Sequence, residues 1–358
     1  MRIKALLEQM VKMDGSDLFI RPKGLPRVRL YGKIVAFGGE VLEIEDVVKL
    51  VEELTNPRQR ELLKNNFDID FAFYLPELDR RFRVSIFVQR NCPSIVIRNV
   101  RNFISSFEEL NLPSDALQKL AMETRGLVLL TGSTGSGKST TLFSMIEYIN
   151  SHCNKHILTL EEPIEYAFND KNSVINQREL GLDVSSYSVA LRAFTLQSPD
   201  VIYIANIRDL ETMSAAMTAA ETGVLVLSTL HTVNAAQTVE RIVNFFPPYQ
   251  HQQIRTQLSY LLKGVISLRL MPLKDKSGRV PAYEVMLLTP TISRLIREGK
   301  VFEMTQFIEE GNIFGMQSFS QSLIKLVNEG KISEEDAINY SDNKDEFSLA
   351  LRGIRRGG

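Results

Sequence analysis

A glycine-rich stretch in the first half of the chain has the residue types and the spacing of a phosphate-binding loop. Gly132-Ser-Thr-Gly-Ser-Gly-Lys-Ser139 fits the pattern G-x-x-x-x-G-K-[ST] and lies between an apolar run and an amphipathic stretch, as that motif requires. Its glycines let backbone N–H groups converge on phosphate oxygens, and a helix that begins there adds partial positive charge. The alternative is a glycine turn that carries a solvated lysine.

The loop predicts a binding site for a nucleoside triphosphate and its metal ion. Lys138 is expected to reach the β- and γ-phosphates, and the Ser139 hydroxyl is expected to hold Mg²⁺. The residues predicted to bind the nucleotide are Gly132, Ser133, Thr134, Gly135, Ser136, Gly137, Lys138, Ser139 and Thr140.

Carboxylates follow a second apolar run and are candidates for metal binding and water activation. The run Ile157–Leu160 leads into Glu161-Glu-Pro-Ile-Glu165, at the edge where open parallel sheets bind ligands. A P-loop ATPase needs acidic groups at strand ends to hold the metal and to position or deprotonate water. Glu161 and Glu165 are therefore predicted site residues, although acidic residues after a strand are also common in solvated loops.

Two further strand ends carry polar side chains. The run Val201–Ile204 is followed by Ala205 and Asn206, so an amide stands where an acid would serve catalysis. His231 directly follows the run Leu225–Leu230, a placement suited to sensing a phosphate. The alternative for a single histidine at such a place is a structural role.

Two arginines line up on a strand predicted near the N-terminus. Arg81 and Arg83 are two residues apart and so project from one face, opposite Phe82, Val84 and Ile86. The strand therefore presents a pair of guanidinium groups on one side. The alternative is that both are solvated.

The first part of the chain is predicted to form an α+β unit. The N-terminus, Met1–Asp14, indicates a short amphipathic helix. From Val28 to Arg98 apolar residues recur with period two, in runs that include Val28–Val35, which predicts strands of a mixed or antiparallel sheet. Helices are expected at Ile44–Leu54 and Pro57–Leu63.

The second part is predicted to form a mostly parallel sheet. The pattern loses its period near Asn99–Pro113, and nearly continuous apolar runs then alternate with helical stretches, as in parallel sheets covered on both faces. A hairpin is expected to turn at Lys276-Ser-Gly278, and residues 291–351 are expected to be helical. The basic end Arg352–Gly358 is expected to be a frayed tail.

Composition excludes several classes of protein. With 42 Lys and Arg against 43 Asp and Glu, the net charge is −1, which argues against a nucleic-acid binder that relies on a broad basic surface. The two cysteines, Cys92 and Cys153, are too far apart for a CxxC pair, which favours a reducing compartment and no zinc module. No stretch approaches the roughly 18 to 20 apolar residues of a membrane span, so any membrane association is expected to be peripheral.

Taken in order along the chain, these segments resemble the bacterial secretion ATPases and, within them, the type IV pilus retraction motors of the PilT/PilU family. The resemblance runs nearly end to end, and residues 85–91 and 289–293 look closer to the PilU branch than to PilT. The segments that carry it are Gly15-Ser-Asp-Leu18, Arg81-Phe-Arg-Val84, the loop Gly132–Ser139, Glu161-Glu-Pro-Ile-Glu165, Asn176-Gln-Arg-Glu179, Arg208-Asp209, Ala220-Glu-Thr-Gly223, Thr229-Leu-His-Thr232 and Gly315-Met-Gln317.

The resemblance implies an architecture and an assembly. It implies a PAS-like N-terminal domain at residues 1–100, a linker at 101–112, and a RecA-like ATPase domain at 113–358 that is helical from about residue 291. It also implies a homohexameric ring with ATP and Mg²⁺ bound between domains.

The same resemblance implies roles for the candidate residues. Glu161 and Glu165 would form an acidic box, with Glu161 joining Ser139 toward the metal, and His231 would report on the nucleotide. The arginines that would approach the γ-phosphate from the N-terminal domain are Arg81, Arg83 and Arg98.

The chain also departs from the family pattern. Ala205-Asn206 stands where the family has Gly-Glu, and Val224 stands where it has His. Glu162 replaces the usual Asp, and Leu196-Gln-Ser198 stands where an arginine and often an aspartate are expected. Asparagine cannot act as a general base, and a positioned base contributes about 10² to 10⁴ in rate. Nucleotide binding with slow turnover is therefore expected.

Two functions of different classes follow. The first is an ATPase that drives or assists pilus retraction and twitching motility, with Glu161 or Glu165 activating water. The second is an ATP-binding ring subunit that is deficient in hydrolysis and acts by docking. A pilus assembly ATPase is disfavoured because no four-cysteine zinc element or extra N-terminal domain is present, and a DNA translocase by the balanced charge.

The resemblance further implies partners and a location. The expected partners are the other copies of a homohexamer, an inner-membrane pilus platform protein and a paralogous retraction ATPase, without nucleic acid. The expected location is the cytoplasm, peripheral to the inner membrane at the base of the pilus.

Overall fold

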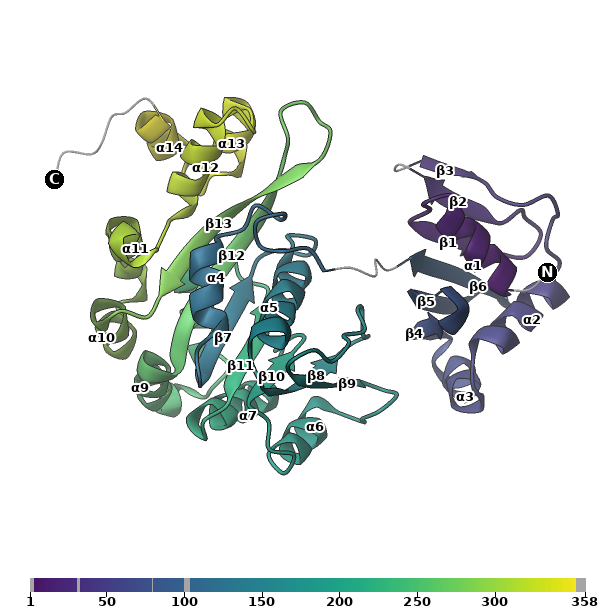
Figure 1. Ribbon diagram of the computed structural model, residues 1–358, viewed down its shortest axis with the longest axis horizontal. Helices are drawn as coiled ribbons and strands as arrows, with labels where there is room; N and C mark the ends of the chain where they lie inside the picture. Colours follow the sequence, from purple (N-terminus) through teal and green to yellow (C-terminus); the bar gives the residue numbers. More distant parts are fainter. Residues whose placement is uncertain (1–2, 31–32, 79, 100–103, 352–358) are drawn as a thin grey trace. The chain divides into compact units, whose positions relative to one another are not determined.

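The computed structural model of the chain describes residues 3–30, 33–78, 80–99 and 104–351 (Figure 1). Its contacts divide the chain into two compact units. The N-terminal unit comprises Met1–Phe103 with Glu161–Phe168, and the C-terminal unit comprises Ile104–Leu160 with Asn169–Gly358. Residues 101–103 of the expected linker and the expected tail 352–358 lie outside the described residues.

The N-terminal unit contains a six-stranded sheet with the strand order β3-β2-β1-β6-β5-β4, and every paired neighbour is antiparallel. Its strands are β1 (Asp17–Ile20), β2 (Arg27–Leu30), β3 (Lys33–Ala36), β4 (Asp68–Leu75), β5 (Arg80–Gln89) and β6 (Cys92–Asn99). Its helices are α1 (Ile3–Lys12), α2 (Ile44–Leu54), α3 (Pro57–Asn66) and the 3₁₀ turn η1 (Pro76–Leu78).

The run Val28–Val35 was expected to be one strand, and this expectation is wrong. It is divided between β2 and β3, which pair antiparallel with Val28 opposite Val35. The pairing of β2 with β3 leaves the alternation of apolar and polar residues intact, so period alone does not reveal the reversal.

The sheet of this unit has one apolar and one polar face. Phe82, Val84 and Ile86 of β5 are fully buried, whereas Arg81 and Arg83, at alternate positions on the same strand, are partly exposed. The buried face joins apolar side chains of α1 and α2 in the core, which include Leu6, Leu7, Met10, Val47 and Leu50. The arginine pair therefore lies on the face away from this core.

The C-terminal unit contains a seven-stranded sheet with the order β13-β12-β7-β11-β10-β8-β9. The pairs β12–β7, β7–β11, β11–β10 and β10–β8 are parallel, and β13 is antiparallel to β12. The strands are β7 (Gly126–Thr131), β8 (His156–Glu161), β9 (Val174–Glu179), β10 (Val201–Ile204), β11 (Leu225–Leu230), β12 (Leu262–Pro272) and β13 (Arg279–Leu287). This arrangement confirms the predicted α/β fold with a mostly parallel second sheet.

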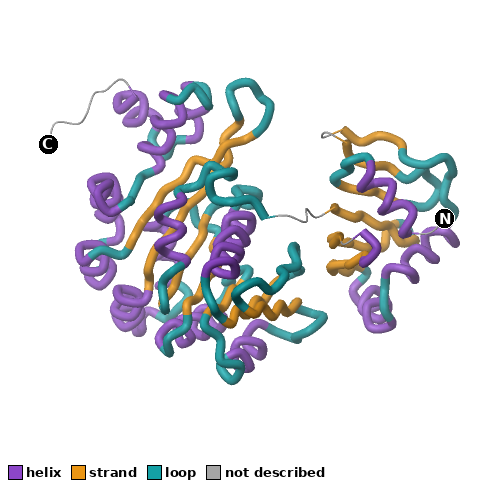
Figure 2. The backbone as a smooth tube through the Cα atoms, viewed as in Figure 1, coloured by secondary structure: helices purple, strands orange, loops and turns teal. Residues whose placement is uncertain are grey.

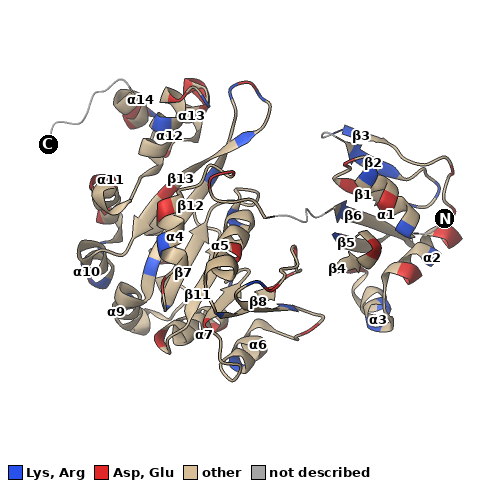
Figure 3. Ribbon diagram, viewed as in Figure 1, with Lys and Arg blue, Asp and Glu red and all other residues tan. Residues whose placement is uncertain are grey.

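Helices cover the central strands of this sheet. Strands β7, β10 and β11 are buried along their whole lengths and carry no charged residue, so they are tan throughout in Figure 3. Strands buried on both faces must be covered on both sides. The helices that precede β12 in this unit are α4 (Ser114–Ala121), α5 (Lys138–His152), α6 (Tyr187–Phe194), α7 (Leu210–Glu221), α8 (Ala235–Val243), the turn η2 (Pro248–Gln250) and α9 (His251–Leu261).

The described part of the chain ends in a helical region, as predicted. The hairpin of β12 and β13, the two longest strands of this sheet in Figure 2, packs against it through Met271, Val280 and Ala282. Its elements are α10 (Pro290–Glu298), η3 (Val301–Glu303), α11 (Met304–Glu310), η4 (Gly311–Phe314), α12 (Phe319–Asn328), α13 (Glu334–Tyr340) and α14 (Lys344–Leu351). Among the described residues, no helix combines the length and the apolar character needed to cross a membrane.

Candidate nucleotide site

The phosphate-binding loop joins β7 to α5. Gly132, Gly135 and Gly137 have φ angles of 141°, 79° and 99°, a region that favours glycine. A Cβ on Gly132 would lie 2.5 Å from both the Leu268 carbonyl oxygen and Ser136 Oγ, so no other residue fits there without displacing backbone. Helix α5 begins at Lys138 without a side-chain cap, which leaves its first N–H groups for a ligand.

Lys138 is folded back onto the loop that carries it. Its side chain is largely buried, and Nζ donates hydrogen bonds of 2.8 Å to the carbonyl oxygens of Gly132 and Ser133. Burial lowers the pKa of this lysine. Ser136 Oγ is also buried and has no hydrogen-bond partner. The loop thus combines an ammonium group, helix N–H groups and an unpaired hydroxyl.

The parallel register brings the ends of the neighbouring strands to the same edge. Thr131 of β7 pairs with Leu230 of β11, so Gly132 and His231 follow directly adjacent strand ends. Ile204 of β10 pairs with Leu160 of β8, one residue before Glu161, which is 1% exposed. The edge therefore collects the loop, the carboxylate at the end of β8, and the segments after β10 and β11.

Asn206 and His231 meet at this edge. Asn206 Nδ2 lies 3.5 Å from His231 Nε2, whereas Asn206 Oδ1 is buried without a partner. The segment that carries Asn206 is held by hydrogen bonds from Ala205 N to the Leu160 carbonyl and from Thr229 Oγ1 to the Ala205 carbonyl. Two strands thus fix the position of the amide.

His231 lies in a positive environment. Burial, followed by the charges of Lys138 and Arg208, lowers its pKa, because each disfavours the imidazolium form. Arg208 was recognised in the sequence as part of a motif but was given no role. The imidazole is therefore neutral near neutral pH, with one ring nitrogen that donates a hydrogen bond and one that accepts.

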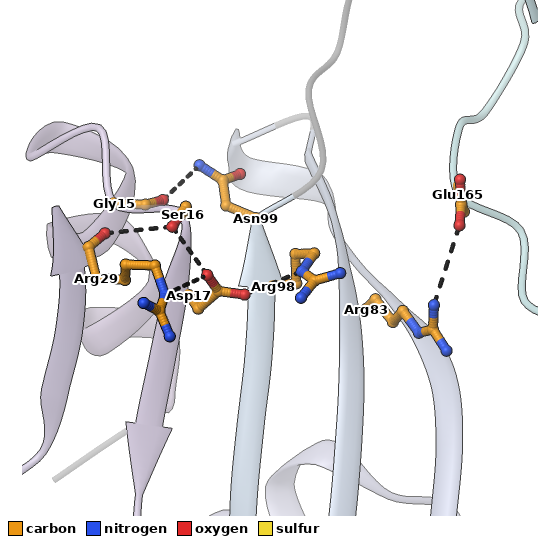
Figure 4. A network of polar contacts seen from close by, with 8 residues as sticks. All are labelled: Gly15, Ser16, Asp17, Arg29, Arg83, Arg98, Asn99 and Glu165. Atoms are coloured by element: carbon orange, nitrogen blue, oxygen red, sulfur yellow. Dashed lines mark hydrogen bonds and ion pairs between the residues drawn. The ribbon is translucent and has the colours of Figure 1, made fainter. Parts of the chain in front are cut away.

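The predicted arginines lie on the N-terminal sheet, where Figure 4 shows a polar network around Asp17. Arg98 and Arg29 lie directly opposite Asp17 on the strands to either side of β1. Asp17 accepts hydrogen bonds from Arg98 Nε at 2.9 Å, Arg29 Nε at 3.2 Å and Ser16 Oγ at 2.9 Å. Asp17 and Arg29 were missed as site residues, although Asp17 lies in the recognised segment Gly15–Leu18.

The charge of Asp17 is stabilised by this network. Burial raises its pKa, but hydrogen bonds from Arg98 and Ser16 and the charges of Arg98 and Arg29 outweigh burial and lower it overall. Arg98 therefore keeps one nitrogen on Asp17 while most of its side chain remains exposed.

Arg83 lies beside Arg98 and reaches two carboxylates. Its guanidinium is 3.7 Å from Asp70. It is 4.0 Å from Glu165, the ion pair drawn in Figure 4. The pKa of Glu165 is raised by burial, with Arg83 and Arg98 acting in the opposite direction. Arg81 stands over the Tyr74 ring at 6.0 Å, and its buried Nε has no hydrogen-bond partner.

The structure therefore brings together two groups of predicted residues. One lies at the edge of the parallel sheet, and the other lies on a face of the N-terminal sheet. Lys138, Asn206 and His231 share the carboxyl edge of the parallel sheet, and Arg83 and Arg98 share a face with the ion pair to Glu165. In the described part of the chain no three His, Cys, Asp or Glu side chains gather as a metal cage. Mg²⁺ keeps water and substrate phosphates as ligands, so one or two protein oxygens, such as those of Ser139 and Glu161, suit it.

Comparisons by family model, by sequence and by structure all give relatives from secretion or pilus systems. Residues 65–339 match the family model described as type II/IV secretion system protein. The chain is 40% identical to the type IV pilus ATPase PilU of Pseudomonas aeruginosa, over 98% of this chain and 92% of PilU. It is also 40% identical to PilT of the same organism, over 94% of this chain and 97% of PilT. A crystal structure of the pilus retraction motor PilT with bound ADP matches with a TM-score of 0.91 and 39% identity, over 97% of this chain and 98% of that one.

Proposed function

Because the chain belongs to the type II/IV secretion system protein family, and within it to the PilT/PilU group of pilus retraction ATPases, we propose that it binds and hydrolyses ATP to drive or assist type IV pilus retraction. The observation that carries the proposal is the phosphate-binding loop. Three glycines with positive φ precede the open N-terminus of α5, and Lys138 supplies the cation beside them.

Binding of the triphosphate would rearrange Lys138. In the present structure its ammonium group satisfies two carbonyl oxygens of the loop, and these bonds are exchanged for phosphate oxygens when a nucleotide enters. Backbone N–H groups of the loop and of the first turn of α5 would hold the remaining charge. When bound, Mg²⁺ supplies charge neutralisation on the phosphates, and Ser139 and Glu161 are the residues that would hold it.

Hydrolysis requires a group that positions or deprotonates water. Asn206 lacks a basic site, so the carboxylates at the end of β8 remain the candidates, with Glu161 buried at the strand end. Neutral His231 would contact the γ-phosphate or the water that attacks it, as a donor through whichever nitrogen bears the proton. Arg81, Arg83 and Arg98 would stabilise the charge that develops on the γ-phosphate.

A second function is favoured by one observation. Asn206 takes the place beside His231 where the family pattern has glutamate, and its buried Oδ1 has no partner. A subunit that binds ATP without turning it over would act by docking, as a partner of a paralogous motor. Phosphate release by the purified chain separates the two functions.

The experiment compares the chain with Lys138→Ala and with Lys119→Ala, an exposed lysine of α4 that serves as the matched control. We expect ADP binding by calorimetry and phosphate release with Mg-ATP in the chain and in the control. Both should be lost in Lys138→Ala. If the chain binds ADP but releases no more phosphate than Lys138→Ala, the result would support the docking subunit instead. Equal ADP binding by all three proteins would refute the loop as the nucleotide site.

We also propose an assembly and a location. The ring would be a homohexamer of this chain, with an inner-membrane pilus platform protein and a paralogous retraction ATPase as partners, on the cytoplasmic side at the base of the pilus. Membership of the PilT/PilU group supports these assignments, and the chain is 40% identical to PilU and to PilT. Light scattering after gel filtration, with and without nucleotide, tests for a sixfold mass.

A further inference from the structure

Glu284 is a buried carboxylate in the middle of an apolar strand. It is 5% exposed, and Ala282, Val285 and Met286 around it on β13 are buried apolar residues. Burial raises the pKa of Glu284 to about 7, against the lowering effect of a hydrogen bond from the Ala235 N–H. A carboxylate at such a place costs free energy unless it is hydrogen-bonded, so its partners indicate what it holds.

The first set of partners leads across the sheet to the phosphate-binding loop. Ser267 of β12 lies directly between Glu284 of β13 and Thr131 of β7. Strand β12 is the neighbour of both β13 and β7 in the sheet (Figure 1). Thr131 Oγ1 donates to Ser267 Oγ at 2.9 Å, and Ser267 Oγ donates to Glu284 Oε1 at 3.4 Å. Thr131 and Ser267 are fully buried, and Thr131 is the residue before Gly132.

The second partner leads to the segment that carries His231. The N–H of Ala235, the first residue of α8, donates to Glu284 Oε1 at 2.7 Å. The connection 231–234 thus runs from the end of β11 to a helix start that Glu284 holds, while the Asn234 side chain caps the N–H of Gln237. A negative charge at the start of α8 also interacts favourably with the helix dipole.

Two charged side chains act on Glu284 from the elements packed around it. Arg269 of β12 lowers the pKa of Glu284, and Asp342, between α13 and α14, raises it. These two are paired with each other, with Arg269 Nη2 2.6 Å from Asp342 Oδ1. Arg269 and Asp342 thus act on Glu284 through their charges, whereas Ala235 and Ser267 donate hydrogen bonds to it and connect it to the site.

We propose that Glu284 is a positioning residue of the nucleotide site, which holds the start of the phosphate-binding loop through Ser267 and Thr131, and the His231 segment through the Ala235 N–H. The inference rests on the proposed function only in taking residues 132–139 and His231 as that site. Because one carboxylate oxygen accepts both hydrogen bonds, the loop and the histidine segment are fixed relative to each other. Protonation of Glu284 weakens both hydrogen bonds at once.

Three variants separate the two branches. Glu284→Gln keeps an acceptor but removes the charge, and Ser267→Ala removes only the branch toward Thr131. Glu240→Gln, the same substitution at an exposed position of α8, is the control. The readouts on the full chain are amide hydrogen exchange of residues 231–240 without nucleotide, the ADP dissociation constant, and kcat/KM for ATP as a function of pH.

We expect exchange at Ala235 to rise about tenfold in Glu284→Gln and to stay unchanged in Ser267→Ala and the control. Both site variants should bind ADP at least about threefold more weakly. In the wild type, kcat/KM should fall as the pH drops through about 7, and Glu284→Gln should remain near the low level at every pH. The expected difference is roughly tenfold, on the scale that small misplacements cost an active site.

The proposal would be overturned by Glu284→Gln and Ser267→Ala variants that match Glu240→Gln within about twofold in exchange, ADP affinity and pH profile. It would equally be overturned by a loss of folding stability in Glu284→Gln with none of these readouts changed. If the wild type releases no phosphate above the Lys138→Ala level, the proposed ATPase activity fails. Exchange at Ala235 and ADP affinity then still decide the role of Glu284.

Discussion

Asn206 Nδ2 lies 3.5 Å from His231 Nε2, so the amide after β10 faces the imidazole after β11. Since an amide nitrogen can only donate, a hydrogen bond between these two atoms requires Nε2 as the acceptor and the ring proton on Nδ1. The lowered pKa of His231 favours the same neutral form. A glutamate in place of Asn206 would instead accept a hydrogen bond from Nε2–H and favour the imidazolium, so the residue at 206 influences the protonation state of the histidine.

Asn206→Glu is predicted to increase turnover. The substitution places a carboxylate at the end of β10, where water can be positioned between it and His231, and a positioned base contributes about 10² to 10⁴ in rate. We expect steady-state phosphate release to rise at least about tenfold, with ADP affinity little changed. Asn206→Gln, which lengthens the side chain without adding charge, should give no increase. An unchanged or lower rate in Asn206→Glu would mean that the base lies elsewhere.

The pKa of His231 is predicted to rise in Lys138→Ala. Burial, Lys138 and Arg208 each disfavour the imidazolium, so removal of the Lys138 charge must shift the pKa upward. Histidine-selective ¹³C labelling and NMR titration measure it, with His231→Gln to assign the resonance among the four histidines. A downward shift, or none, would show that Lys138 does not act on the imidazole.

Glu161→Gln is predicted to abolish hydrolysis while nucleotide binding remains. The side chain is almost fully buried at the end of β8, and glutamine has the same shape, so the variant should fold. Loss of the carboxylate should reduce phosphate release by about 10² to 10⁴, with the ADP dissociation constant within about threefold. Glu240→Gln on the exposed face of α8 serves as control. Retained hydrolysis would move the catalytic role to Glu165 or another group.

Local patterns predicted the parts of the fold that carry a strong signal. The buried strands β7, β10 and β11 are continuous apolar runs, and the glycine spacing of the loop has one chemical use, so both were recognised from sequence. Strand β1 is only four residues long and includes Asp17, and in β9 burial does not follow polarity, since Val174 is exposed and Glu179 is buried. Neither strand shows an alternation of apolar and polar residues long enough for sequence analysis to detect.

Contacts between distant residues account for what the sequence did not reveal in the site. Asp17 and Arg98 are 81 positions apart, and Glu284 and Ala235 are 49 apart. In the sequence, a single acid in a strand has the same signal as any solvated position. Only the strand order, which places β1 beside β6 and β13 beside β12, reveals that these carboxylates hold other site residues.

Asp17→Asn is predicted to destabilise the N-terminal unit in a pH-dependent way. The carboxylate accepts hydrogen bonds from Arg98, Arg29 and Ser16, and its loss should reduce the free energy of unfolding by about 1 to 3 kcal/mol, toward the lower value because both guanidiniums are partly exposed.

The sign of the pH effect follows from the lowered pKa of Asp17. A carboxylate with a folded-state pKa below its ordinary value of 3.8 stabilises the fold above that value, and the stabilisation is lost as the pH falls through the folded-state pKa. Urea unfolding should therefore separate Asp17→Asn from the wild type near neutral pH, and the two should converge in acid. Asp14→Asn, an exposed aspartate before β1, is the control. A difference that persists undiminished in acid would show that the charge of Asp17 does not hold Arg98 and Arg29 in place.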